Sequence, residues 1–145
     1  MKKNVYWISL LIASLSFSTN AFSGDHSKGK ESYLEGQQAV LDAFGWDFKK
    51  AEITIEKINE NNHVLFGLGG NILVNSGTDG VLIVDDQFPQ LKNKIMRAIR
   101  KVGGKKIDYI VNSHWHFDHA EGNIAFGKTG SKIIAHENSR FMMIN

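Results

Sequence analysis

The chain has 145 residues, of which 42% are hydrophobic and 22% are charged. These proportions are typical of a globular protein with one compact domain, and they exclude a fibrous or wholly disordered chain. The formal net charge is only +2, and no basic run alternates with aromatic residues, so no nucleic-acid partner is expected. Because the chain has no cysteine, disulfides and thiolate ligands are excluded as well.

Residues 1–23 have the pattern of a secretory signal peptide. Lys2 and Lys3 precede an apolar stretch that ends near Phe17, and small residues then offer a cleavage site around Ala21. The stretch is shorter than the ~20 residues of a membrane-spanning helix, which favours cleavage over an uncleaved anchor. The sequence therefore predicts a periplasmic or secreted protein without stable membrane association after cleavage.

Residues 24–50 are expected to form a flexible polar tail followed by one amphipathic helix. The apolar residues between Glu31 and Phe44 recur at helical intervals. A helix of this kind most simply covers the edge of a core.

From residue 51 onward, strand and helix patterns alternate. Short apolar runs predict strands at Ile53–Glu56, Val64–Phe66, Ile72–Val74, Val81–Val84, Ile107–Val111 and Ile133–Ala135. Helical spacing predicts helices over Gln90–Val102, with its basic residues on a solvated face, and over Glu137–Ile144. The continuously apolar strand Val81–Val84 is expected to be covered on both faces. This order of elements indicates an α/β fold with a mixed sheet.

Four side chains of metal-ligand type lie within six positions: His114, His116, Asp118 and His119. In an extended segment residues i and i+2 point the same way, so His114 and His116 can bind one ion. Asp118 and His119 suit a second ion if the chain turns into a helix there. Nitrogen and oxygen ligands suit zinc, with iron or manganese as alternatives. Two adjacent metals indicate hydrolysis, because bound metal lowers the pKa of water from 15.7 to about 7.

The segment His114–His119 matches the H-x-H-x-D-H signature of the metallo-β-lactamase superfamily, and residues 51–145 resemble this family as a whole. The supporting segments are Gly69–Asn71, Gly80–Asp85, Tyr109–Ser113 and Ile134–Glu137. The resemblance implies the first half of an αββα sandwich with a dinuclear zinc site. His114 and His116 would hold the first zinc, and Asp118 and His119 the second. Asp118 would also orient or deprotonate the attacking water.

The remaining ligands of this family are expected beyond residue 145, so residues 51–145 are interpreted as the N-terminal half of the domain, truncated at the C-terminus. We expect a metal-dependent hydrolase, or its fragment, acting through metal-bound hydroxide on an ester, lactone, thioester or amide bond of a small-molecule substrate, β-lactams included. Two alternatives stay open: an iron-dependent or di-iron oxidoreductase on the same fold, and an inactive truncated metal-binding module. The chain alone is expected to bind metal weakly and to hydrolyse little, and the sequence does not indicate an oligomeric state.

Four further expectations concern residues outside the set of predicted ligands. Asp85, at a strand end, either caps a turn or orients a ligand histidine. Gly69 and its neighbours form a tight turn that borders the substrate cleft. Trp115 and Phe117, which alternate with the histidines, are expected to pack in the core. His63 is expected to be exposed.

Overall fold

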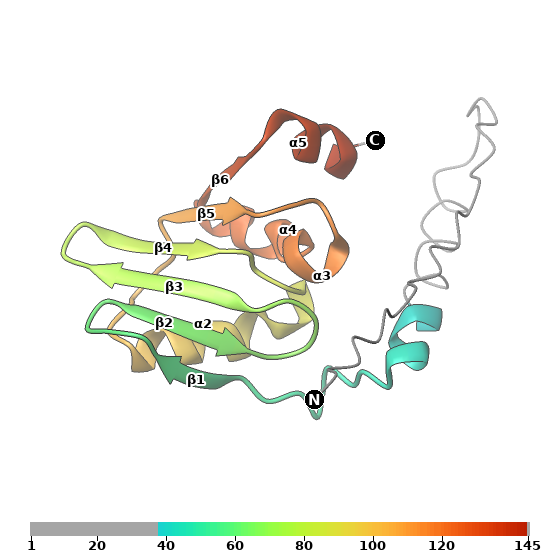
Figure 1. Ribbon diagram of the computed structural model, residues 1–145, viewed down its shortest axis with the longest axis horizontal. Coiled ribbons are helices and arrows are strands. Elements are labelled where there is room, and N and C mark those ends of the chain that lie inside the picture. Colours follow the sequence, from blue (N-terminus) through green and yellow to red (C-terminus); the bar gives the residue numbers. More distant parts are fainter. Residues whose placement is uncertain (1–37, 145) are drawn as a thin grey trace, which may run out of the picture. The chain divides into compact units, whose positions relative to one another are not determined.

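The computed structural model describes residues 38–144 (Figure 1). The predicted signal peptide lies outside the described residues, and so does most of the predicted tail and first helix, of which residues 38–44 are helical. No described helix is both long enough and apolar enough to cross a membrane.

Six strands form one sheet in which spatial order follows chain order. They are β1 (Thr54–Lys57), β2 (Asn62–Phe66), β3 (Ile72–Gly77), β4 (Gly80–Val84), β5 (Tyr109–Asn112) and β6 (Lys132–Ala135). β1 to β4 pair antiparallel through short connections, whereas β4, β5 and β6 are parallel because helical segments connect them. The mixed sheet and the α/β class predicted from the sequence are confirmed.

The long helix of the fold is α2 (Lys92–Lys101), which follows a 3₁₀ turn, η1 (Pro89–Leu91). After β5 come α3 (Phe117–Ala120), α4 (Asn123–Phe126) and a second 3₁₀ turn, η2 (Gly127–Thr129). The described chain ends with α5 (Glu137–Ile144). The sequence predicted α2 and α5 but did not resolve α3 and α4, since a one-turn helix leaves no detectable apolar period.

The hydrophobic core lies between α2 and one face of the sheet (Figure 1). Alternate strand residues point to this face, and those of β3 and β4 are buried, as are the helix residues Ile95 and Ile99. Leu82 and Val84, which point to the other face of β4, are only half-buried. The expectation that β4 is covered on both faces is therefore wrong for the described residues, which cover one face only. His63 is also buried rather than exposed, because it shares the covered face with Leu65.

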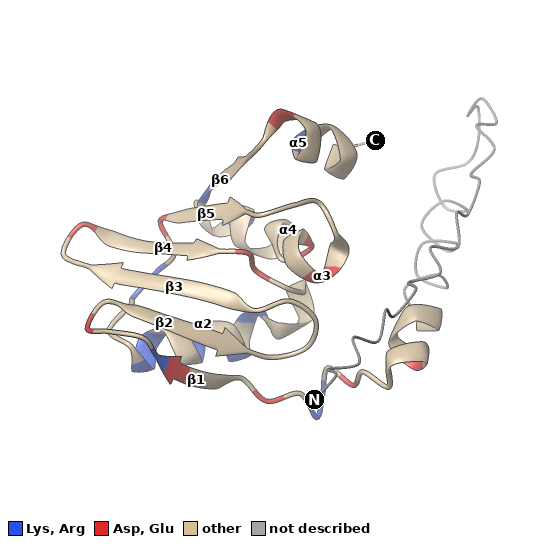
Figure 2. Cartoon of the chain, in the orientation of Figure 1, with Lys and Arg blue, Asp and Glu red and all other residues tan. Residues whose placement is uncertain are grey.

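Basic residues gather on the outer side of α2 (Figure 2). The helix carries five of them and no acidic residue: Lys92, Lys94, Arg97, Arg100 and Lys101. The Lys94 ammonium donates to the backbone carbonyls of Phe48 and Lys49, at 2.8 Å each, and of Ala51 at 2.5 Å. This lysine ties the segment before β1 to the helix, so the expected solvated face is formed by the exposed Arg97, Arg100 and Lys101 rather than by all five basic residues.

The two edge strands of the described sheet differ in character. β1 carries Glu56 and Lys57, whereas β6 exposes Ile133 at 41% and Ile134 at 50%. Successive strand residues point to opposite faces, so β6 exposes an apolar side chain on each face.

Candidate metal centre

The predicted ligands lie where the parallel strands β4 and β5 end. β5 leads through Ser113 into the histidine segment, and α3 turns the chain directly afterwards. β4 ends in Asp85, whose amide donates to the Val111 carbonyl at 2.9 Å and so continues the parallel pairing. The carboxyl ends of neighbouring parallel strands are the usual location of ligands in α/β sheets.

His114 and His116 face each other through the nitrogens that can bind one metal ion. His114 Nε2 lies 2.9 Å from His116 Nδ1, and the ring centroids are 4.6 Å apart. Two nitrogens bound tetrahedrally to one zinc at 2.0–2.1 Å would be about 3.3 Å apart. The observed 2.9 Å is a hydrogen bond between the rings, slightly shorter than that separation, so the two rings would have to move apart a little to share an ion.

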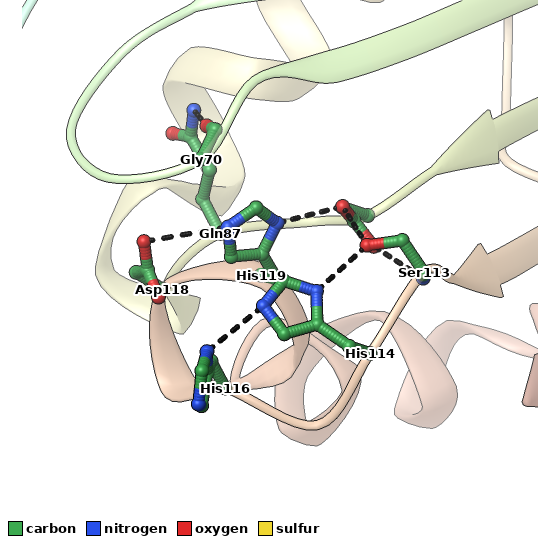
Figure 3. Close-up of polar contacts among 8 residues, drawn as sticks. Gly70, Gln87, Ser113, His114, His116, Asp118 and His119 are labelled. Carbon is green, nitrogen blue, oxygen red and sulfur yellow. Dashed lines mark hydrogen bonds and ion pairs between the residues drawn. The ribbon is translucent and has the colours of Figure 1, made fainter. Parts of the chain in front are cut away.

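Asp118 and His119 form a second pair beside the first (Figure 3). Both residues lie on α3, so consecutive side chains do not point to opposite sides as they would in an extended segment. The distance from Asp118 Oδ2 to His119 Nε2 is 3.5 Å. The rings of His114 and His119 are 4.1 Å apart between centroids. The structure thus brings all four predicted residues together, with contacts both within the two predicted pairs and between them.

Asp85 connects the two pairs from behind. Its Oδ2 lies 2.7 Å from His119 Nδ1 and accepts from the Ser113 hydroxyl at 2.7 Å. The same hydroxyl oxygen is 2.9 Å from His114 Nδ1. Holding the Nδ1 atom of each ring in this way turns Nε2 toward the other predicted ligand of its pair, His116 or Asp118. Asp85 also accepts from the Ser113 amide at 2.7 Å. It therefore both bonds to a backbone amide after the strand and contacts a predicted ligand histidine, the two roles that the sequence left open.

Asp85, His114 and His119 each offer a donor atom within 4.8 Å of the others, which makes Asp85 a third possible ligand. We assign it to the support of the ligands instead, because its Oδ2 is already engaged by His119 and Ser113. Asp85 has a φ of 64°, a left-handed conformation that aspartate tolerates better than most residues.

The surroundings favour an uncharged His114. Burial lowers the pKa of its imidazole, and the neighbouring rings of His119 and His116 lower that pKa further. Asp85 and Asp118 oppose the shift only in part. Since a protonated imidazole has no free lone pair, a lowered pKa keeps the ring ready to bind metal at neutral pH.

Two buried carboxyl groups lie next to these ligands. Burial, followed by the charge of Asp85, raises the pKa of Asp86 to about 8, and burial raises the pKa of Glu121 to about 7. No hydrogen bond to either side-chain oxygen of Asp86 is formed within the described residues. The nearby Gly122 amide favours the charged form slightly, although it donates its own hydrogen bond to the Gln87 carbonyl. Asp86 is therefore held neutral at pH 7.

Trp115 and Phe117 do not pack in the core as expected. Their exposed fractions are 43% and 40%. The alternation that predicted burial ends when α3 begins at Phe117, whose ring reaches Phe88 only at 5.9 Å between centroids. Both aromatic residues therefore present surface next to the ligand pairs.

The sequence did not single out Gln87, which is fully buried beneath the loop of residues 67–71, here called the glycine loop. Its φ is 55°, which a sequence pattern does not reveal in a residue other than glycine. The glycine loop itself lies against Asp118 and His119, in agreement with the expected turn beside the site. The glycine pair Gly69–Gly70 next to a strand was the sequence signal that could have pointed to this close packing.

The four residues fit a zinc centre by donor type and by spacing. All are nitrogen or carboxylate donors, each pair converges, and Asp85 supplies the buried carboxylate that commonly orients ligand histidines. Their side chains are half-buried or exposed, so the donor atoms are open to an incoming ion or substrate.

The fold and this donor set define an α/β protein with a candidate metal centre at the carboxyl ends of its parallel strands. The family model described as the metallo-beta-lactamase superfamily matches residues 59–144. The chain belongs to this superfamily.

Solved structures share the fold. A subclass B3 metallo-beta-lactamase of Bradyrhizobium japonicum is similar at 26% identity and a TM-score of 0.56, over 63% of this chain and 36% of that one. A subclass B3 enzyme from a soil metagenome library matches at 22% identity and a TM-score of 0.57, over 66% and 37%. A mono-zinc metallo-beta-lactamase of Pseudomonas aeruginosa matches at 20% identity and 0.57, over 63% and 45%. The chain thus spans less than half of the length of these structures.

Proposed function

We propose that this chain contributes the first ligand cluster of an exported zinc-dependent hydrolase. The observation that carries the proposal is the pair of converging contacts, His114 with His116 at 2.9 Å and Asp118 with His119 at 3.5 Å. The family membership and the similarity to metallo-beta-lactamases support it.

The residues would divide the work as follows. His114 and His116 would hold one zinc, and Asp118 and His119 a second. Bound zinc supplies Lewis-acid chemistry, acidifying a water and polarising a carbonyl oxygen. Asp118 would orient a water molecule and accept its proton, and Asp85 would keep both rings aligned through His119 Nδ1 and, by way of Ser113, His114 Nδ1.

The substrate class is a small molecule with an ester, lactone, thioester or amide bond, including β-lactams. Metal-ligand sets of this kind serve many reactions, so the fold gives no bond priority. Trp115 and Phe117 offer apolar contact area beside the pairs, which favours a substrate with an apolar or aromatic group next to the cleaved bond. Periplasmic or secreted location remains a prediction from residues 1–23.

Zinc titration of the purified chain tests the assignment. We expect His114→Ala to remove binding at one half-site, and His119→Ala at the other, each weakening it at least tenfold. His136→Ala is the matched control, because His136 is exposed and lies after β6. An equal loss in the control would contradict the assignment, and so would tight zinc binding in a His114→Ala, His119→Ala double variant.

Turnover and metal content separate the hydrolase from its rivals. The chain, and the longest reading frame that contains it, are assayed against ester, lactone, thioester and β-lactam substrates with and without a chelator. Chelator-sensitive turnover that Asp118→Asn reduces by roughly 100-fold or more would support the proposal. Iron with visible absorbance in the protein as isolated would favour the oxidoreductase instead.

A further inference from the structure

Gln87 occupies the inside of the glycine loop. The residue is fully buried, and its side-chain amide donates to the Gly70 carbonyl. A Cβ on Gly67 would lie 2.5 Å from Gln87 Oε1, so the absence of a side chain there makes room for the glutamine. The side chain is thus enclosed by backbone from both ends of the loop.

Gln87 is itself held from the other direction. Its carbonyl accepts from the Gly122 amide at 2.8 Å, and it forms an isolated parallel bridge with Ala120. The preceding residue, Asp86, donates its amide to the His119 carbonyl at 2.8 Å. The backbone around Gln87 is therefore fixed to the helical segment that carries Asp118 and His119.

The glycine loop rests directly on those two ligands. A Cβ on Gly69 would lie 2.6 Å from Asp118 Cβ, and a Cβ on Gly70 would overlap the His119 imidazole. The Gly70 amide donates to the Asp118 carbonyl at 3.2 Å. Figure 3 shows Gly70 and Gln87 on one side of the His119 ring and Ser113 with His114 on the other.

His119 is consequently confined from two sides. Asp85 fixes its Nδ1 atom at 2.7 Å, and the backbone of Gly70 limits how far the ring can rotate or move away. Loops without strand pairing are ordinarily the mobile parts of a fold, so something must hold this one in place. Two described hydrogen bonds hold it at Gly70, one from the Gln87 side-chain amide to the Gly70 carbonyl and one from the Gly70 amide to the Asp118 carbonyl.

We propose that Gln87 is a positioning residue, which clamps the glycine loop onto His119 and thereby sets the orientation of the Asp118–His119 ligand pair. The proposal rests on the proposed function only in regarding His119 as a ligand. The clamp acts through the backbone of Gly70 and does not touch metal or substrate. Its effect falls first on the Asp118–His119 pair, because the described contacts of the glycine loop are with Asp118 and His119, and it can reach His114 only through the His119 ring, 4.1 Å away between centroids.

The test uses the metal-free chain and the variant Gln87→Met, which keeps the volume and removes the amide. We expect the Gly70 amide to exchange with solvent roughly tenfold faster or more, as for a locally opened segment. We also expect the His119 ring nitrogens to shift toward averaged tautomer values in nitrogen NMR spectra, by more than those of His116, whose ring has no described contact with the His119 ring. In zinc titration the Asp118–His119 pair should weaken more than the His114–His116 pair.

Asn75→Ala is the control, because it removes a 2.8 Å side-chain hydrogen bond to Asn62 at the far end of the same hairpin. Gly67→Ala, whose Cβ would lie 2.5 Å from Gln87 Oε1, displaces the glutamine without meeting His119 and serves as the second variant if Gln87→Met does not fold. Wild-type exchange at Gly70 with unchanged His119 signals in a folded variant would overturn the clamp. Failure of every variant, and of the parent chain, to bind zinc would overturn the proposed function while leaving the NMR result to decide the clamp.

Discussion

The polar side chains at the two ends of strands β4 and β5 differ in how completely they are hydrogen-bonded. At the opposite end from the ligands, Asp108 accepts from the Val81 amide at 3.0 Å and pairs with Lys106 at 2.7 Å. At the ligand end, Asp85 and Gln87 have positive φ, and both Asp86 side-chain oxygens lack a hydrogen bond among the described residues. One end is built for stability, whereas the other retains strain and buried polar groups, as functional sites commonly do.

The largest expected effect is on zinc affinity, and it distinguishes Asp85 at the ligand end of the strands from Asp108 at the opposite end. Asp85→Asn keeps a residue that tolerates positive φ but removes the charge that holds His119 and Ser113. We expect zinc affinity to fall roughly 10–100-fold, as for lost support of metal ligands. Asp108→Asn should leave zinc affinity unchanged. Competition with a chromophoric chelator measures both, and equal losses would remove the contrast.

Two glycines extend the comparison to packing. A Cβ on Gly122 would lie 2.7 Å from the Asp86 Cγ, whereas a Cβ on Gly77, at the opposite end, meets nothing within 4 Å. Gly122→Ala should therefore destabilise the fold by roughly 1–3 kcal/mol through overpacking. Gly77→Ala should change stability by less than about 0.5 kcal/mol. Urea unfolding of the two variants would contradict this if their midpoints moved together.

Asp86 provides a pH-dependent difference. Its pKa of about 8 lies above the unfolded value, so the folded metal-free chain retains a proton that the unfolded chain releases. The contribution of Asp86 to the free energy of unfolding is therefore most favourable below pH 4, and it is lost as pH rises toward 8. Asp86→Asn should remove this slope and stabilise the chain at pH 8 by roughly 1–3 kcal/mol. Thermal unfolding at pH 5 and pH 8 shows whether the gain is confined to the higher pH.

The smallest effect belongs to Asp108. Its hydrogen bond from Lys106, together with that from the Val81 amide, lowers the pKa of its carboxyl. A lowered pKa means that the stabilisation is present above the unfolded value and is lost as pH falls through the folded value. Asp108→Asn should therefore lower stability slightly at pH 7, by an amount that disappears as pH falls below the folded pKa, and should make acid unfolding slightly less steep below pH 4. An acid titration followed by circular dichroism measures the slope.

Sequence patterns predicted the sheet and the ligands for different physical reasons. The strands alternate or run apolar because burial demands it, so β2 to β5 could be located within a few residues. The ligand cluster was visible because metal binding requires rare side chains at short spacing, and the structure does bring His114, His116, Asp118 and His119 together.

The contacts that support the ligands were less accessible. Gln87 looks like an ordinary polar residue in the sequence, and only its positive φ and the nearby glycines make it a clamp. The burial of His63 and the exposure of Trp115 depend on which face a strand presents and where α3 begins. Such features follow from the tertiary arrangement, which a local pattern does not contain.

The edge strand β6 has a consequence for the behaviour of the protein in solution. Within the described residues β6 is an edge strand, and a strand edge flanked by apolar side chains can pair with another chain. Ile133 and Ile134 are such side chains, and Lys132 is the one charged residue of β6. β1, at the other edge, carries adjacent opposite charges that discourage such contacts. We therefore expect the purified chain to aggregate through β6 at high concentration. Replacing Ile134 with a charged residue should reduce this aggregation.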